Sequence, residues 1–255
     1  LLQECEDIVA PYGVALLPEI HEHYTMQKKI AGQDYYVYDF ALPMLLINAI
    51  YYGNTEYLKH WLAICPRKQF TTLDTHDGIG VVDVKDLLPD EEIERTKEDI
   101  FRYGANVKKI YNTAAYNNLD IYQVNCSYYS ALGDDDDAYL LARAVQFFAP
   151  GIPQVYYVGL LAGKNDLKLL EETKVGRNIN RHYYTKEEVA EEVKRPVVKG
   201  LLELMEFRNT HPAFGGSFTL LDCGKNELYI ERSCGDAWAR LHADFSAKTF
   251  QITCS

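Results

Sequence analysis

Short apolar runs alternate with helix-forming stretches along most of the chain, and this alternation limits the fold more than any other feature of the sequence. Runs typical of strands buried on both faces occur at residues 14–17 (VALL), 35–38 (YYVY), 69–73 (QFTTL) and 152–158 (IPQVYYV). Helical spacing occurs at residues 44–64, 90–101, 138–148 and 197–208, with another helix starting near residue 186. Strands that alternate with helices indicate parallel α/β units, and four such units predict half of an eight-stranded (β/α)8 barrel.

The pattern changes near Gly216, where turn residues begin to separate short strands that have no helix between them. These strands are predicted at residues 217–221, 227–231, 238–242 and 250–253. Closely spaced strands joined by turns are typical of a small antiparallel sheet. We therefore predict two domains, a partial (β/α)8 catalytic barrel at residues 1–215 and a C-terminal β domain at residues 216–255.

The composition excludes several classes of protein. Hydrophobic residues make up 47% of the 255 positions, which is enough for a sizeable core, so a disordered chain is excluded. A net charge of −11 and a pI near 5.1 argue against a nucleic-acid partner, because phosphate binding needs clustered Lys and Arg. The apolar runs are far shorter than the roughly 18 residues that span a bilayer, so no membrane partner is expected.

The six cysteines are widely scattered and none forms a CxxC pair, so zinc and thioredoxin-type sites are not expected. No signal peptide is visible, and the default is therefore a cytoplasmic protein with reduced thiols. The 20 tyrosines are an unusual number, and their flat apolar faces and hydroxyls suit the faces and edges of sugars.

Polar side chains are concentrated in the segments that follow three of the predicted strands. They lie at residues 18–24 (PEIHEHY), 74–80 (DTHDGIG) and 176–182 (GRNINRH). Because reactive groups of parallel barrels converge at the carboxyl ends of the strands, Glu19 and Asp77 are expected to face one site. Paired carboxylates in different environments are the usual apparatus of glycosidic chemistry: a protonated one donates to the leaving oxygen and an ionised one supports a cationic sugar.

Each of these residues also has a structural interpretation. A carboxylate after a strand is more often a helix cap or a loop ligand than a catalytic group. His21 and His23 alternate with Glu22 in a spacing that permits metal binding, but no third ligand is evident, so no metal and no other cofactor is expected.

Five segments resemble the sucrose phosphorylases, a family of the α-amylase-like glycoside hydrolases and transferases. They are LLPEIHEHY, TTLDTHDGIGVVDVKDLLPDEEI, YNNLDIYQVNCSYYSALGDDD, APGIPQVYYVGLLAGKNDL and GRNINRHYY. The resemblance runs from Leu1 to about Pro212. It implies the second half of the barrel, about strands five to eight, and retaining transfer of glucose from sucrose to phosphate, giving α-glucose 1-phosphate and fructose.

The resemblance also implies roles for individual residues. Glu19 matches the general acid/base after strand five, and Asp77, preceded by His76, matches the transition-state stabiliser after strand seven. His21 would line the fructose or acceptor side, and Arg177 would bind the glucosyl unit near its far hydroxyls. In the loop of residues 119–123, Asp120 would hold fructose hydroxyls, Tyr122 would contact phosphate and Gln123 would lie near the site.

The sequence departs from the family at the nucleophile. A retaining mechanism needs a carboxylate that forms a covalent glucosyl intermediate, and in the family this is an Asp after strand four within an Arg-x-Asp segment. No such segment precedes Leu1, and Glu22, Asp34 and Asp74 do not match the motif. The first ten residues also read as a helix entered midway. We therefore expect the later part of a longer protein, which alone is inactive and poorly folded or associated.

Other functions remain open at this stage. Sister phosphorylases that act on sucrose 6′-phosphate or glucosylglycerate share the barrel motifs and differ in their acceptor loops. A non-catalytic sugar-binding fragment is the alternative from another class. The full-length parent is a possible homodimer.

Overall fold

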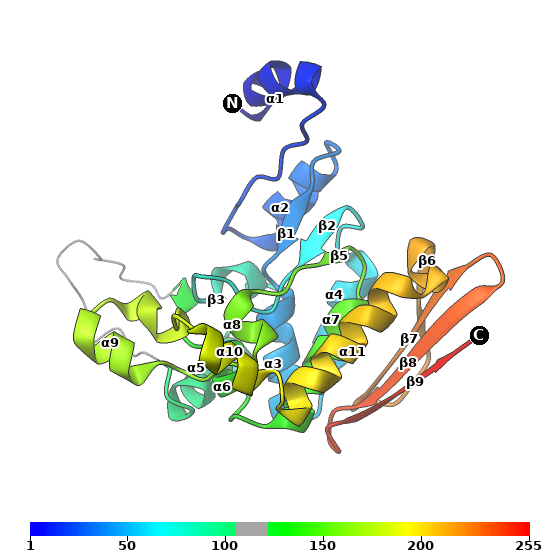
Figure 1. Ribbon diagram of the computed structural model, residues 1–255. Coiled ribbons are helices and arrows are strands. Elements are labelled where there is room, and N and C mark those ends of the chain that lie inside the picture. The colour runs from blue at the N-terminus through cyan, green and yellow to red at the C-terminus, as the bar shows by residue number, and fades with distance from the viewer. Residues whose placement is uncertain (106–121) are drawn as a thin grey trace.

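The computed structural model describes residues 1–105 and 122–255, and its centre is a short parallel sheet (Figure 1). The sheet holds β1 (Val37–Asp39), β2 (Gln69–Thr71) and β5 (Ile152–Pro153) in the order β1-β2-β5. Both pairings are parallel, with Tyr38 opposite Phe70 and Phe70 opposite Ile152. Because parallel neighbours need a crossover, helices fill the chain between consecutive strands of this sheet.

The strands expected at residues 35–38 and 69–73 are confirmed in shorter form, but two expectations are wrong. Residues 14–17 form no strand and run as coil between a 3₁₀ turn (Ala10–Tyr12) and α2 (Tyr24–Ala31). The run at 152–158 pairs only over β5, and its end turns into α8 (Tyr157–Leu160). The parallel sheet therefore has three strands where four were expected, and the barrel half is not confirmed.

The long helix expected at residues 44–64 is two helices, α3 (Leu42–Tyr52) and α4 (Glu56–Ile64). Gly53 ends α3 in the left-handed conformation, with φ of 62°, which glycine adopts at little steric cost. The other expected helices are present. They are α5 (Asp90–Arg102), α7 (Asp136–Phe148), α10 (Lys186–Glu192) and α11 (Pro196–Thr210).

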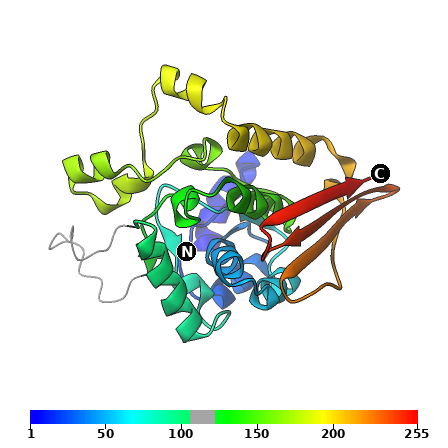
Figure 2. The same ribbon diagram turned by 90° about the horizontal axis from the view of Figure 1, so that it is seen from below.

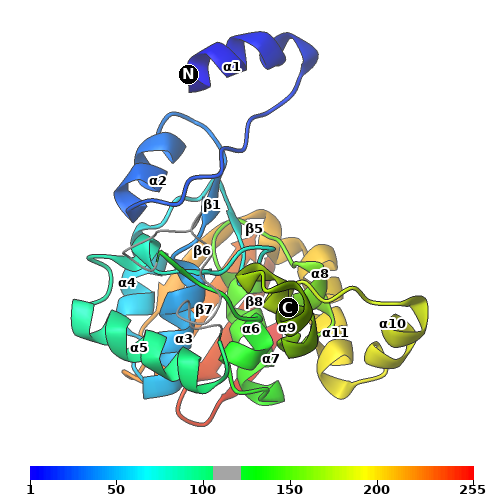
Figure 3. The same ribbon diagram turned by 90° about the vertical axis from the view of Figure 1, so that its left-hand side faces the viewer.

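The main core forms around α3 and α7, which are buried along nearly their whole length. α3 is apolar on almost every side, whereas α7 also buries the polar side chains of Arg143 and Gln146. α3 packs on α4 and α5, and α7 packs on α11 and on the C-terminal sheet. At the other end of the chain, α1 (Leu2–Val9) buries no residue and stands away from the sheet (Figures 1 and 3). The remaining helical segments are α6 (Tyr128–Ala131), α9 (Leu167–Thr173) and the 3₁₀ turns Val82–Val84, Gly176–Asn180 and Pro212–Gly215.

The C-terminal strands form the expected antiparallel sheet, in the order β6-β7-β8-β9, along one side of the molecule (Figure 2). They are β6 (Ser217–Leu221), β7 (Glu227–Cys234), β8 (Ala237–Asp244) and β9 (Thr249–Cys254). Burial alternates along β7, and its inward residues Leu228 and Ile230 belong to the same apolar cluster as α7. One core therefore runs across the boundary predicted at residues 215 and 216, and the division into two domains stays a prediction.

A second, two-stranded sheet positions the loops near the carboxyl end of β2. It pairs β3 (Ile79–Gly80) with β4 (Gln123–Val124) in antiparallel register, so that Gly80 lies opposite Gln123. Among the described residues, no helix has both the length and the apolar composition needed to cross a membrane.

Candidate active site

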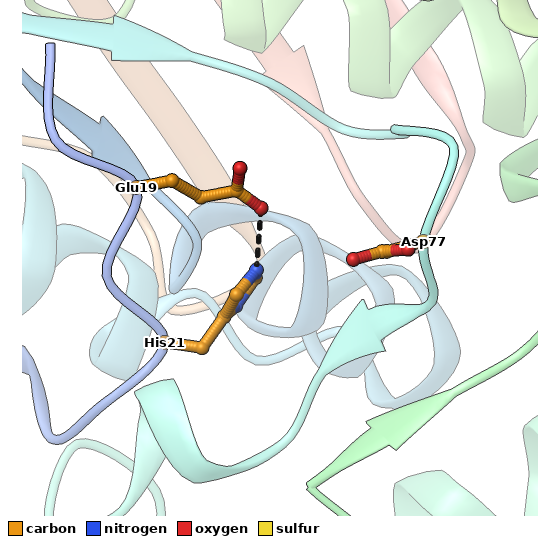
Figure 4. Close-up of side chains that lie close together, drawn as sticks. All are labelled: Glu19, His21 and Asp77. Atoms are coloured by element: carbon orange, nitrogen blue, oxygen red, sulfur yellow. Dashed lines mark ion pairs between the residues drawn. The ribbon is translucent and has the colours of Figure 1, made fainter.

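Glu19, His21 and Asp77 lie together although they come from distant parts of the chain (Figure 4). One side-chain oxygen or nitrogen of each residue lies within 4.8 Å of those of the other two. Glu19 and His21 are on the coil before α2, and their Oε1 and Nε2 atoms are 3.4 Å apart. Asp77 is on the loop between β2 and β3. The two carboxylates that the sequence analysis expected to face one site are therefore neighbours.

The loop that carries Asp77 is held by hydrogen bonds between side chains and its backbone. The Asp77 amide donates to Thr75 Oγ1 at 3.0 Å, and Asn180 Nδ2 donates to the carbonyl oxygens of Thr75 and Asp77 at 3.0 and 2.6 Å. A Cβ at Gly78 would lie 2.7 Å from the carbonyl oxygen of Val124, so this close approach requires glycine. The backbone around Asp77 is therefore fixed from three sides before any ligand binds.

The Asp77 carboxylate is largely buried and faces two guanidinium groups. Arg177 Nη1 lies 2.8 Å from Asp77 Oδ1, and Arg181 Nη2 lies 3.4 Å from the same oxygen. Arg181 also donates through Nε to the carbonyl oxygen of His76 at 2.7 Å. The side chain of His76 is 59% exposed, with Nε2 3.7 Å from Asp77 Oδ1. Charge-assisted contacts of this kind offset the negative charge of the carboxylate.

The same contacts bear on metal binding. Glu19, His21 and Asp77 together offer two carboxylates and an imidazole, a donor set that some divalent cations accept. A cation at this point would compete with Arg177 for the Asp77 oxygen and would meet the positive charge of two arginines. The electrostatics therefore favour a site that binds a polar neutral molecule or an anion over one that holds a metal ion.

Gln123, which begins β4, and Tyr122, which precedes it, extend the cluster. Gln123 Oε1 accepts a hydrogen bond from the Gly78 amide at 3.3 Å, which directs its Nε2 toward His21, 3.3 Å from Nε2 and 3.4 Å from Nδ1 of the ring. Arg177 Nη2 donates to the Tyr122 hydroxyl at 3.2 Å. Of the expected site residues, Asp120 lies outside the part of the chain that the structure describes.

Buried polar groups lie under His21. Its ring stacks on Phe40 with centroids 4.0 Å apart, and its Nδ1 lies 3.9 Å from Oδ2 of Asp83, whose side chain is fully buried. Burial by itself lowers the pKa of His21, but Asp83 and Glu19 outweigh it and raise that pKa above its usual value. Burial raises the pKa of Asp83 in spite of His21, and burial raises the pKa of Asp39 to about 6 in spite of a hydrogen bond from Trp61.

The sequence analysis did not single out four residues that support this cluster: Asn180, Arg181, Asp83 and Arg143. Asn180 and Arg181 lie in the segment GRNINRH that was already marked, so proximity to Arg177 was the available signal. Asp83 in VVDV and Arg143 in LARAVQFF are lone charges within apolar runs. A charged residue at a position where the apolar pattern predicts the core is itself the signal for a buried, partnered charge, because charged residues are rarely buried without a partner.

The fold is similar to that of α-amylase-like proteins. The structure superimposes on the α-amylase from H. orenii with a TM-score of 0.61 at 14% identity, covering 95% of this chain and 45% of that one, which shows the fold alone. No protein-family model matches the chain.

Two phosphorylases are much more similar. The sucrose phosphorylase of Streptococcus mutans is 58% identical over 99% of this chain and 53% of its own length. The crystal structure of the sucrose 6F-phosphate phosphorylase from Thermoanaerobacter thermosaccharolyticum has a TM-score of 0.93 at 41% identity, covering 99% of this chain and 52% of that one. The chain is a homologue of the sucrose phosphorylases and spans about half the length of the curated relatives it matches.

Proposed function

We propose that this chain supplies the acid/base side of a sucrose phosphorylase active site. The reaction is transfer of glucose from sucrose to phosphate with retention, giving α-glucose 1-phosphate and fructose. One observation carries the proposal: Glu19 and Asp77 place carboxylate oxygens within 4.8 Å of each other in a chain that is 58% identical to a sucrose phosphorylase. Retaining cleavage of a glycosidic bond uses an acid/base carboxylate and a nucleophilic one, and in this proposal Glu19 is the first of these, with Asp77 as a further, stabilising carboxylate.

In this proposal Glu19 is the general acid and base. Its side chain is about half exposed, so it reaches a bound disaccharide, and its contact with His21 at 3.4 Å gives its proton a nearby partner. The carboxylic acid donates a proton to the fructose oxygen as the bond breaks. The carboxylate then accepts a proton from the incoming acceptor, and phosphate, which is already anionic, needs little such help.

Asp77 is the stabilising carboxylate. It pairs with Arg177 and Arg181 and accepts hydrogen bonds from glucosyl hydroxyls that strengthen as positive charge develops on the ring. Its fixed backbone limits the reorganisation needed in the transition state. Arg177 and His76 flank this carboxylate and are proposed to contact the glucosyl unit.

The acceptor side is proposed to include His21, Tyr122 and Gln123, together with Asp120, which lies outside the described residues. The hydrogen bond from Arg177 to the Tyr122 hydroxyl brings a cation and a hydroxyl donor to the place where phosphate would enter. An anion held by a guanidinium and a hydroxyl is a strong, charge-assisted arrangement. The pocket would then hold fructose as a neutral sugar and phosphate as an anion in turn.

No carboxylate of this sequence matches the nucleophile of the family, because none lies in an Arg-x-Asp segment. We therefore propose that the 255 residues alone do not turn over sucrose. The test is phosphate-dependent release of fructose from sucrose by the expressed chain. A second assay is run under the same conditions after adding the portion of the Streptococcus mutans enzyme that does not align with this chain. Turnover by the chain alone contradicts the proposal of inactivity, and turnover in the mixture supports glucosyl transfer.

Glu19→Gln tests the acid role in the active mixture. Cleavage of sucrose should slow far more than cleavage of glucosyl fluoride, since fluoride leaves without needing a proton. The matched control is Glu22→Gln, which changes a neighbouring carboxylate that does not match the catalytic motif. Equal losses on both substrates would remove Glu19 from the acid role.

Sucrose 6′-phosphate is the second candidate donor, favoured by the TM-score of 0.93 to the sucrose 6F-phosphate phosphorylase structure. The higher identity of 58% to a sucrose phosphorylase favours sucrose. Rates with the two donors at equal concentration decide between them, and binding of either sugar without turnover in the mixture would indicate a sugar-binding role.

A further inference from the structure

Asp83 is a fully buried carboxylate directly beneath the proposed site. It lies in the 3₁₀ turn Val82–Val84, and its side chain has no exposed surface. Oδ1 accepts a hydrogen bond from Gln27 Nε2 at 3.2 Å. Oδ2 accepts none from the residues that the structure describes. A buried carboxylate oxygen without a partner is expensive, so its surroundings need an explanation.

The group that faces this oxygen is the imidazole of His21. Nδ1 of His21 lies 3.9 Å from Asp83 Oδ2, and Nε2 on the other side of the ring lies 3.4 Å from Glu19 Oε1. Phe40 stacks on the ring and limits its tilt. The imidazole of His21 therefore lies between the buried carboxylate of Asp83 and the proposed acid, Glu19.

The backbone is also shaped to admit Asp83. A Cβ at Gly80 would lie 2.3 Å from Asp83 Oδ2, closer than two such atoms can approach. Any side chain at residue 80 would therefore displace the carboxylate from its place below His21. The absence of a side chain at residue 80 leaves room for the carboxylate to face the imidazole.

We propose that Asp83 is a positioning residue that fixes the tautomer of His21. The Asp83 carboxylate attracts the proton of the imidazole to Nδ1, which leaves the lone pair on Nε2 directed at Glu19. Nε2 then accepts a hydrogen bond from the Glu19 carboxyl when that acid carries the proton it donates. The same logic, a buried carboxylate that selects the tautomer of a histidine, operates in the Ser-His-Asp triad.

The nearest carboxylate to the ring is Glu19, 3.4 Å from Nε2, and an ionised Glu19 would draw the proton to Nε2. The proposed tautomer therefore belongs to the state in which Glu19 carries its own proton, and the remaining groups do not select either nitrogen. Gln123 Nε2 approaches both ring nitrogens about equally, at 3.3 and 3.4 Å. An Asp77 oxygen lies within 4.8 Å of a ring nitrogen of His21, and its charge is offset by Arg177. Asp39 is buried near Asp83 and contacts Trp61, not His21. Among the described residues, Asp83 is thus the charged group that faces Nδ1, and the raised pKa of His21 agrees with that placement.

Asp83 could instead serve the fold alone, through its bond to Gln27 and its fit against Gly80. The two roles differ in one observable. A residue that only supports the turn has no reason to control which nitrogen of His21 carries the proton. The ¹⁵N NMR signals of the imidazole report that nitrogen directly, without substrate and without catalysis.

The first measurement uses the 255-residue chain with Glu19→Gln, so that residue 19 is uncharged as in the protonated acid. It is made at a pH where His21 is neutral, with its signals assigned by comparison with His21→Gln. We expect the Nδ1–H tautomer. A neutral His21 that carries its proton on Nε2 overturns the proposal, and this result needs no variant at Asp83 that folds.

The second measurement adds Asp83→Asn, which keeps the shape and the acceptor for Gln27, to this Glu19→Gln chain. The amide can donate to Nδ1, so the tautomer should switch to Nε2–H and the pKa of His21 should fall. Asp86→Asn is the matched control, because Asp86 contacts the neighbouring His23 at 3.0 Å and should leave His21 unchanged. An unchanged His21 in Asp83→Asn contradicts the proposal.

The catalytic meaning of this arrangement rests on the proposed function, but its test does not. If the active mixture fails to transfer glucose while the tautomer switches as expected, the proposed function falls and the Asp83–His21 relation stands. If glucosyl transfer occurs and the tautomer is independent of Asp83, only the positioning role is lost.

Discussion

Arg143 and Asp74 form a buried ion pair at the base of the loop that carries Asp77. The guanidinium has no exposed surface, and its Nη2 lies 2.8 Å from Asp74 Oδ2. It also donates to the Tyr139 hydroxyl and to Gln146 Oε1. A cation taken fully out of water needs such a set of acceptors, and the geometry of arginine suits several at once.

Arg143→Met should destabilise the protein strongly. The change leaves the Asp74 carboxylate buried without its partner, a loss that typically costs about 3–5 kcal/mol. Urea unfolding followed by circular dichroism measures the free energy of unfolding. Lys194→Met is the control, because Lys194 and Glu191 pair at 2.6 Å on the surface, where solvent screens the interaction. Equal effects of the two substitutions would show that the Arg143 pair contributes no more than a surface pair.

Asp39 should give the protein a pH-dependent stability. Its pKa is about 6 in the folded chain against an ordinary value of 3.8, so the folded state holds a proton that the unfolded state has lost in this interval. Stability from this group is therefore greatest below the unfolded pKa and falls as pH rises through the folded one. The loss amounts to about 2 kcal/mol between about pH 4 and about pH 7.

Asp39→Asn tests this by removing the titrating group. Urea midpoints measured at both pH values should fall less for the variant than for the unaltered chain. Burial raises the pKa of Asp83 as well, and the two carboxylates repel each other, so the difference between the profiles reports the titration of Asp39 together with its effect on Asp83. Parallel pH profiles for the two proteins would contradict a raised pKa at Asp39.

At the scale of helices and strands, the sequence predicts what depends on neighbours in the chain. The helices α5, α7 and α11 and all four C-terminal strands were predicted, because the apolar period of each segment is local information. Residues 14–17 show the limit. An apolar run shows that a segment can be buried in a sheet, but a strand forms only against a partner, and this segment pairs with none among the described residues.

The same dependence on tertiary packing determines which residues of the site could be predicted from the sequence. Asp77 was predictable because it follows β2, and loops after parallel strands meet at one end of a sheet. Glu19 lies beside it as expected, but the strand on which that expectation depended, residues 14–17, is coil. Asp83 and Arg143 were not predictable, because whether a charge in an apolar run is buried beside a partner depends on which segments pack together. The partners of Arg143 include Asp74, which lies 69 positions away in the chain.

Gly53→Ala should destabilise the junction of α3 and α4. The residue has φ of 62°, where a Cβ costs roughly 1–2 kcal/mol, and the added Cβ would lie 2.9 Å from Ser246 Oγ. Gly235→Ala is the control, since Gly235 has φ of 58° with no atom within 4 Å of the added Cβ. Thermal unfolding should show a larger loss for Gly53→Ala, and a larger loss for Gly235→Ala would contradict the role of the Ser246 contact.

At the scale of the whole molecule, the parallel sheet has two open edges. With the order β1-β2-β5, the outer edges of β1 and β5 are unpaired within the described residues. Open edges of parallel strands are usually covered or closed into a barrel. A small apolar cluster lies beside β1, where Ile30, Tyr35 and Val37 pack with Leu16 and Ile20 from the coil that precedes α2. This coil is thus already near the edge of β1.

Residues 14–17 should become a strand when the rest of the sheet is supplied. The chain spans about half of its relatives, and the unaligned portion of the Streptococcus mutans enzyme is the natural source of further strands. Hydrogen–deuterium exchange of the chain, alone and mixed with that portion, measures protection of these amides. They should exchange rapidly alone and slowly in the mixture, because backbone hydrogen bonds to a neighbouring strand protect them. The amides of β8 serve as the internal reference, since β8 is already hydrogen-bonded to β7 on one side and to β9 on the other. Unchanged exchange at 14–17 in a mixture that binds would mean that this apolar run is a coil in the assembled protein too, and that Glu19 is positioned by its contact with His21 and not by a strand.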